Sequence, residues 1–128
     1  MKRDGTINAE LAGALAALGH TDLVVVCDAG LPIPSGPTVV DLAFRFGVPS
    51  FETVLSGLLE ELVIEGATAA EEVERNLRSH ELLKIQLPDL GLVPHEELKR
   101  IVARAKLVVR TGEATPYSKV ILRCGVPF

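Results

Sequence analysis

The sequence contains no tryptophan, and only one tyrosine and four phenylalanines occur among its 128 residues. With so few aromatic rings, a core has to be built mainly from Leu, Val, Ile and Ala. The hydrophobic content of 48% is ordinary for a globular protein, and the length is sufficient to bury a real core. We therefore expect residues 1–128 to form one domain.

Basic residues are also fewer than acidic ones, 13 against 17. The formal net charge is −4, and no run of Lys and Arg interrupts the acidic balance, which argues against a nucleic acid or an anionic membrane as a partner. No apolar run approaches the length needed to span a membrane, and no signal-peptide pattern opens the chain. The expectation is a cytoplasmic protein with no nucleic-acid partner and no membrane partner.

Metal-binding and cofactor-binding motifs are missing as well. The two cysteines, Cys27 and Cys124, lie in separate apolar, strand-like segments, so we expect reduced core residues rather than a disulfide. No Cys-x-x-Cys or His-x-x-x-His pair is present, and no glycine-rich phosphate loop is found. We therefore expect neither a metal nor another cofactor, and burial should leave the Cys27 thiol a poor nucleophile.

Short apolar runs alternate with amphipathic segments along the chain. The clearest strand is Leu23–Cys27, an unbroken run of apolar, mostly β-branched residues that suits a strand buried on both faces. The alternation predicts an α/β domain with a largely parallel sheet covered by helices on both faces. Residues 76–93 fit a helix or a strand equally well and stay unassigned. Further strands are expected at 38–42, 63–67, 107–109 and 120–122.

Polar residues mark the expected starts of the helices. Asn8 and Ser50 each precede an amphipathic segment and suit the N-cap position. Thr68 is expected to open a third, acidic helix, and Pro94 suits the first turn of a fourth. The expected helices cover residues 9–18, 51–62, 68–74 and 94 to about 104.

Ionisable residues surround the strand at 23–27. His20 stands on the turn before it, and Asp28 follows it at a sheet edge, where α/β proteins keep their ligand crevices. Farther along, His95 and Lys99 share one face of the fourth expected helix. A histidine can donate or accept a proton near neutral pH, so general acid–base chemistry is open to these groups. Alternatively, His20 and Asp28 are structural turn residues, His95 and Lys99 form a solvated face, and Tyr117 packs with its hydroxyl at the surface.

Three separated motifs resemble the D-ribose pyranase family, which is related to the L-fucose mutarotases. They are residues 19–34, which include Gly-His-Thr-Asp and Asp-Ala-Gly-Leu-Pro-Ile-Pro, residues 47–51, Gly-Val-Pro-Ser-Phe, and residues 112–117, Gly-Glu-Ala-Thr-Pro-Tyr. The resemblance implies an isomerase that interconverts the pyranose and furanose rings of D-ribose without redox change. One group has to protonate the ring oxygen while another accepts the anomeric proton, which needs no metal or nucleotide.

The resemblance also implies roles for individual residues. The position that matches His20 is the family's catalytic proton donor. Where the family usually has Tyr-x-Asn, this chain has Tyr117-Ser118-Lys119, so a lysine replaces the asparagine. The lysine ammonium offers no acceptor atom, and the sugar preference is therefore open. The positions that match the family's sugar contacts are Asp28, His95, Lys99, Tyr117, Ser118 and Lys119.

Members of this family assemble as rings, commonly stacked into decamers, with sites shared between subunits. We therefore expect a pentamer or decamer in which His20 and Asp28 of one chain face a single crevice, completed by His95, Lys99 and Tyr117 of a neighbour. Two alternatives remain open. The chain could be a mutarotase acting on fucose or another sugar, or a non-catalytic sugar-binding partner of a ribose uptake system.

Overall fold

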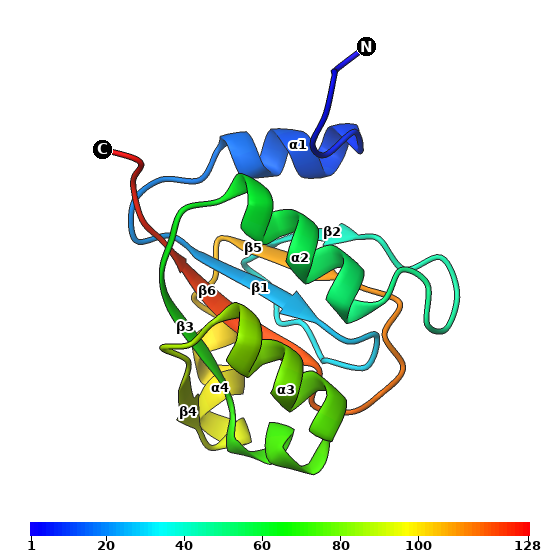
Figure 1. Cartoon of the computed structure of the whole chain (residues 1–128), viewed down its shortest axis with the longest axis vertical. Helices are drawn as coiled ribbons and strands as arrows, with labels where there is room; N and C mark the ends of the chain where they lie inside the picture. Colours follow the sequence, from blue (N-terminus) through cyan, green and yellow to red (C-terminus); the bar gives the residue numbers. More distant parts are fainter.

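A six-stranded sheet forms the middle layer of the computed structural model, which describes all residues from 1 to 128 (Figure 1). The strand order is β2–β5–β1–β6–β3–β4, so β1 is a central strand, as predicted. Five strands run in one direction, and only β6 runs against its neighbours β1 and β3. The predicted largely parallel sheet is therefore confirmed. The strands are β1 (Leu23–Cys27), β2 (Thr38–Asp41), β3 (Ile64–Ala70), β4 (Gly91–Val93), β5 (Leu107–Arg110) and β6 (Lys119–Cys124).

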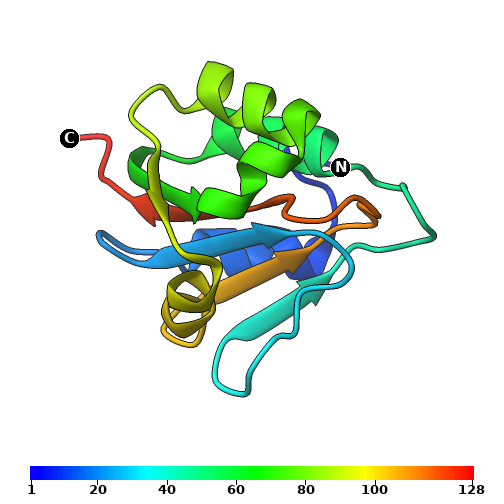
Figure 2. The ribbon, with the colours of Figure 1, turned by 90° about the horizontal axis from the view of Figure 1, so that it is seen from below.

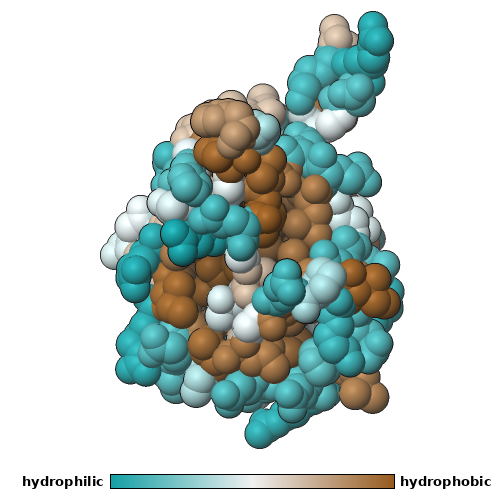
Figure 3. Space-filling model, turned by 60° about the vertical axis from the view of Figure 1, so that its left-hand side comes forward, coloured by the Kyte–Doolittle hydropathy of each residue, from teal (hydrophilic) through white to brown (hydrophobic).

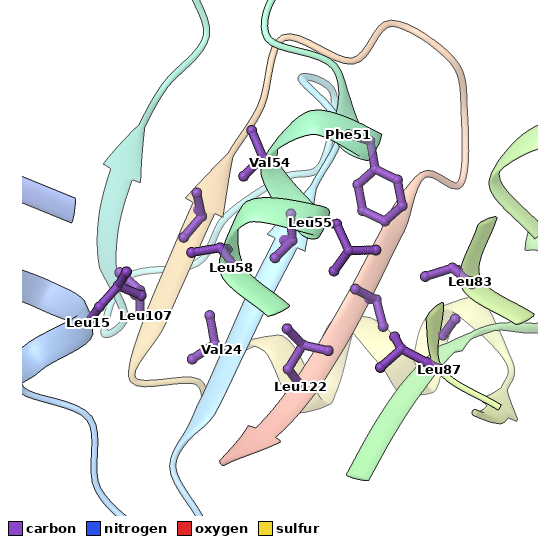
Figure 4. Packing of buried hydrophobic residues seen from close by; sticks show 14 of the residues in the cluster. Leu15, Val24, Phe51, Val54, Leu55, Leu58, Leu83, Leu87, Leu107 and Leu122 are labelled. Atoms are coloured by element: carbon purple, nitrogen blue, oxygen red, sulfur yellow. The ribbon is translucent and has the colours of Figure 1, made fainter. Parts of the chain in front are cut away.

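Helices cover both faces of this sheet, as the alternating pattern predicts (Figure 2). Successive side chains of a strand point to opposite faces, so Val24 and Val26 pack under α1, α2 and α3, whereas Val25 and Cys27 pack against α4. Figure 4 shows the larger of the two cores, with Leu55 and other α2 side chains above the central strands. The helices are α1 (Ala9–Ala16), α2 (Phe51–Glu61), α3 (Leu77–Gln86) and α4 (His95–Val102), with a short 3-10 helix at Glu71–Arg75.

The predicted helix starts at Asn8 and Ser50 are confirmed. The Asn8 side chain accepts a hydrogen bond from the backbone N–H of Leu11 (2.9 Å), and the Ser50 hydroxyl accepts one from Thr53 (3.1 Å). Both caps are local interactions, which is why they can be recognised in the sequence. None of the helices combines the length and the apolar character needed to cross a bilayer.

The start predicted for the third helix is wrong, because Thr68 lies within β3 and pairs with Ile121 of β6, and the acidic segment forms only the short 3-10 helix Glu71–Arg75. Ala69 and Ala70, which favour helix on their own, are fully buried, and this burial overrides their intrinsic preference. The unassigned segment 76–93 forms α3, a turn and β4.

Candidate functional site

A buried ion pair marks the carboxyl end of β1. Asp28 directly follows this strand, and Lys119 opens β6, whose antiparallel register places it opposite Cys27. The Lys119 Nζ lies 3.2 Å from Asp28 Oδ2, and each of the two side chains is only 6% exposed. The other carboxylate oxygen, Asp28 Oδ1, accepts a hydrogen bond from the backbone N–H of Gly30 (3.0 Å). Two opposite charges are thus held out of water where β1 ends and β6 begins, in the middle of the sheet.

Two rings lie beside this ion pair. The imidazole of His95, the first residue of α4, meets the Tyr117 ring edge to face, with 5.7 Å between the ring centroids. The Lys119 ammonium lies 5.7 Å from the Tyr117 centroid, within cation–π range. Tyr117 is held at a φ of +62°, an uncommon backbone conformation for a residue other than glycine. The structure therefore brings together four of the predicted site residues, Asp28, His95, Tyr117 and Lys119, within one chain.

Two polar atoms at this site have no hydrogen-bond partner. They are Oδ2 of Asp28, which approaches Lys119 without hydrogen-bond geometry, and Nδ1 of His95, and both are buried. Burial lowers the pKa of His95 below its ordinary value of 6.5, and the positive charges of Lys119 and Lys99 lower it further. A neutral imidazole keeps one nitrogen as an acceptor. Because unsatisfied buried polar atoms cost roughly 1–3 kcal/mol each, the site favours a ligand that carries hydroxyl donors.

Asp28, Tyr117 and Lys119 line a cleft of about 480 Å³, a size that suits a small molecule, whereas His95 packs against Tyr117 and is not part of the lining. The charged lining of the cleft consists of two acidic and two basic side chains, so it favours an uncharged polar ligand. Sequence reasoning missed Arg110 and Glu113 as lining residues. Of the two, only Glu113 could have been recognised, because it lies within the motif at 112–117. The lining includes Asp28, Gly30, Phe46, Arg110, Glu113, Thr115, Tyr117 and Lys119.

Besides His95, two of the predicted sugar contacts, Ser118 and Lys99, lie outside the lining of this cleft. The Ser118 hydroxyl is buried beneath it, where it contacts Ser79 Oγ (2.6 Å) and accepts a hydrogen bond from Asn76 (3.1 Å). Lys99 pairs with Glu96 (3.1 Å) and lines a separate hollow beside the proline loop. Ser118 therefore supports the loop that carries Tyr117. Lys99 does not line the cleft, and its positive charge acts on the site by lowering the pKa of His95.

His20 lies at the opposite end of β1. Its side chain is 52% exposed, and it lines a hollow formed with the C-terminal residues 124–128. The expected crevice shared by His20 and Asp28 is therefore absent from the single chain, because five extended residues at about 3.3 Å each separate the two sites. The expected division between subunits also needs correction, since Asp28 shares its chain's cleft with Tyr117 rather than with His20.

The His20 imidazole has a partner that sequence reasoning missed. Its Nε2 lies 3.0 Å from Glu65 Oε2, and Glu65 Oε1 forms an ion pair with Arg123, whose Nε is also 3.0 Å away. The only local signal for Glu65 was the glycine that follows it in a strand, which is typical of a bulge.

The two thiols behave as core residues. Cys27 and Cys124 are both buried and unpaired. Burial raises the pKa of the Cys27 thiol to about 12 and also raises that of Cys124. The thiolate required for nucleophilic chemistry is therefore strongly disfavoured at Cys27, as the sequence predicts.

Comparison with known proteins agrees with the architecture. Residues 1–127 match the model of the RbsD / FucU transport protein family, and the chain belongs to this family. It is 70% identical to a Rubrobacter xylanophilus protein named D-ribose pyranase 1, over the whole of both chains. It is 41% identical to Bacillus subtilis RbsD, solved with D-ribose, with a TM-score of 0.96 over the whole of both chains. A Streptococcus pneumoniae fucose mutarotase, solved with L-fucose, shares the fold with a TM-score of 0.80 at 18% identity, over the whole of both chains.

Proposed function

We propose that this chain is an isomerase that interconverts the pyranose and furanose forms of D-ribose. The observation that carries this proposal is the unpartnered Oδ2 atom of Asp28 in an electrically balanced cleft, together with the unpartnered Nδ1 atom of His95, which packs against Tyr117 of the cleft lining. Sugar hydroxyls are the donors that such atoms need. The 70% identity to a D-ribose pyranase over the full length of both chains supports ribose as the sugar.

The reaction breaks the bond between C1 and the C5 oxygen and forms one between C1 and the C4 oxygen, and proton transfers are the only help that it needs from the protein. Protonation of the ring oxygen and removal of the anomeric hydroxyl proton open the pyranose to the aldehyde. The C4 hydroxyl then adds to the aldehyde carbon in place of the C5 hydroxyl and gives the furanose, with no net gain or loss of atoms or electrons. Asp28, His95 and Lys119 hold the free hydroxyls, and His20 donates the proton to the ring oxygen. A positioned acid or base contributes about a hundredfold to ten-thousandfold in rate.

The site is completed between copies of the chain in this proposal. A sugar held at Asp28 cannot reach His20 of the same chain, so the partner subunit's His20 has to supply the proton. Exposed apolar side chains support association: Phe44 is 77% exposed, and Phe46, on the rim of the cleft, is 87% exposed. Apolar surface also lies open around β3 and the C-terminus (Figure 3). A closed pentameric ring, alone or stacked into a decamer, gives every chain the same neighbour.

Two further expectations belong to the same proposal. Residues 1–128 form one domain, which is supported by the single sheet that joins strands from the first to the last quarter of the chain. A reducing, cytoplasmic location is consistent with the two buried thiols, which remain unpaired.

The proposed activity is tested by proton exchange NMR with D-ribose and L-fucose measured side by side. Exchange between the pyranose and furanose signals of ribose should rise well above the spontaneous rate. Faster anomer exchange of fucose without ribose ring exchange would instead support a mutarotase. This alternative is open because Lys119 stands where the family usually has Asn. Ribose binding without any exchange would support the non-catalytic partner of an uptake system.

Sharing of the site is tested by mixing two inactive variants, His20→Ala and Asp28→Asn. After unfolding and joint refolding, random assembly should pair an intact His20 with an intact Asp28 at about a quarter of the interfaces. Ring exchange should therefore recover to roughly that fraction of the wild-type rate. Mixed protein that stays inactive while assembling normally would show that both residues have to come from one chain.

A further inference from the structure

Glu65 occupies an irregular position in β3. This strand pairs with β6 through Ile64 opposite Cys124 and Gly66 opposite Arg123, so the register shifts at Glu65. A bulge of this kind adds one residue to a strand and re-aims its side chain, and bulges are common beside active sites. Here the bulged residue directs its carboxylate to His20 on one side and to Arg123 on the other, each at 3.0 Å.

The turn that carries His20 is fixed at several points. Asp22 Oδ2 accepts hydrogen bonds from the Gly19 backbone N–H (2.7 Å) and from Lys106 Nζ (2.9 Å). The Thr21 backbone N–H donates to the Cys124 carbonyl (2.9 Å), and Thr21 itself has a φ of +70°. A non-glycine residue persists in this conformation only where its surroundings hold it there, which is a recurrent feature of functional sites.

We propose that Glu65 is a positioning residue for His20: it accepts the Nε2–H hydrogen bond, so the imidazolium donates its proton to the sugar from Nδ1, and the neutral tautomer that remains keeps its proton on Nε2. This inference rests on the proposed function, because it requires His20 to transfer the proton. The chain supplies no hydrogen-bond partner to Nδ1, whereas Nε2 is occupied by Glu65. Arg123 binds the second carboxylate oxygen, so Glu65 cannot rotate away without losing both contacts.

The substitution Glu65→Gln gives a sharp test, because Arg123 has donors and no acceptor. The glutamine therefore has to turn its amide oxygen to Arg123 and its NH₂ group to His20. The imidazole then accepts at Nε2, and its own proton moves to Nδ1. Glu65→Gln should thus invert the tautomer while it preserves shape, and Glu65→Ala should leave the tautomer unfixed. Glu60→Gln removes the same charge from an exposed residue of α2 and serves as the matched control.

The experiment records nitrogen-15 spectra of the full chain labelled at histidine, together with ribose exchange rates and ribose affinity. The chain has three histidines, so the His20 signals are identified by their loss in His20→Ala. Neutral His20 should carry its proton on Nε2 in wild type and in Glu60→Gln, and on Nδ1 in Glu65→Gln. Glu65→Gln and Glu65→Ala should lower the ring-exchange rate about tenfold to a hundredfold at unchanged ribose affinity, by analogy with the loss seen when the partner that orients a metal-bound histidine is removed.

The outcomes separate this proposal from the one on which it rests. Wild-type His20 with its proton on Nδ1, or an unchanged tautomer and exchange rate in Glu65→Gln, would overturn the role of Glu65 while the isomerase proposal stands. Ring exchange that survives His20→Ala would overturn the proton donor itself, and the positioning role with it. The wild-type spectrum alone decides the tautomer even if a Glu65 variant does not fold.

Discussion

The two ends of β1 carry the same kind of chemistry in opposite surroundings. At the carboxyl end, the ion pair between Asp28 and Lys119 is buried beneath a cleft, and at the amino end the pair between His20 and Glu65 is largely exposed. Desolvation makes a buried pair expensive, whereas an exposed pair contributes little to stability. Under the proposed function, the buried end holds the sugar, and the exposed end orients His20 toward a sugar bound by the neighbouring chain.

The largest effect should come from disabling the exposed end. His20→Ala should lower ribose ring exchange by about a hundredfold to ten-thousandfold, the usual contribution of a general acid or base. The free energy of unfolding should change by less than about 0.5 kcal/mol, because the side chain lies at the surface. Exchange NMR and urea unfolding check the two parts of this prediction. A large loss of stability would mean that His20 has a structural role and that the two ends differ less than their exposure indicates.

Breaking the buried end should cost stability first. Lys119→Met leaves the Asp28 carboxylate buried without its countercharge, which typically costs about 3–5 kcal/mol. The matched control is Lys84→Met, since Lys84 pairs with Glu81 on the exposed face of α3 at 2.9 Å. That change should cost less than about 1 kcal/mol. Urea unfolding of both variants makes the measurement, and equal losses would show that burial does not distinguish the two pairs.

A smaller effect should appear in the pH dependence of stability. The pKa of His95 is lowered by burial and by Lys119 and Lys99, against the opposing charges of Glu72 and Glu96. The unfolded chain therefore binds a proton more readily than the folded chain, so stability should rise with pH up to about 6.5, the ordinary value for histidine. His95→Gln should flatten that rise without removing it, because carboxyl groups also titrate. Unfolding curves between pH 5 and pH 8 test this, and an unchanged slope would contradict the lowered pKa.

Local signals explain what the sequence could predict. A strand such as β1 and the helix caps at Asn8 and Ser50 depend on residues only a few positions away. Their roles can therefore be recognised in the sequence. Thr68 was misassigned because its conformation depends on pairing with β6 and on the burial of the alanines that follow, neither of which a short window contains.

Pairing between distant strands explains what was missed at the site. The proximity of Lys119 to Asp28 follows from the antiparallel direction of β6, whereas strands alternating with helices predict parallel neighbours. Glu65 was missed because its bulge exists only where β3 pairs with β6. The separation of His20 from Asp28 could have been predicted from the sequence, because an extended strand of five residues places the residues before and after it far apart.

The antiparallel course of β6 has a consequence for how activity depends on concentration. This strand begins with Lys119 beside Asp28 and carries Arg123 beside Glu65 near its other end, so in the proposed arrangement every chain has one complementary half of a site at each end. If the halves meet between copies, a lone chain holds no complete site, an open row of n chains holds n − 1, and only a closed ring holds one site per chain. Specific activity should then fall on dilution below the assembly threshold, although every chain remains folded.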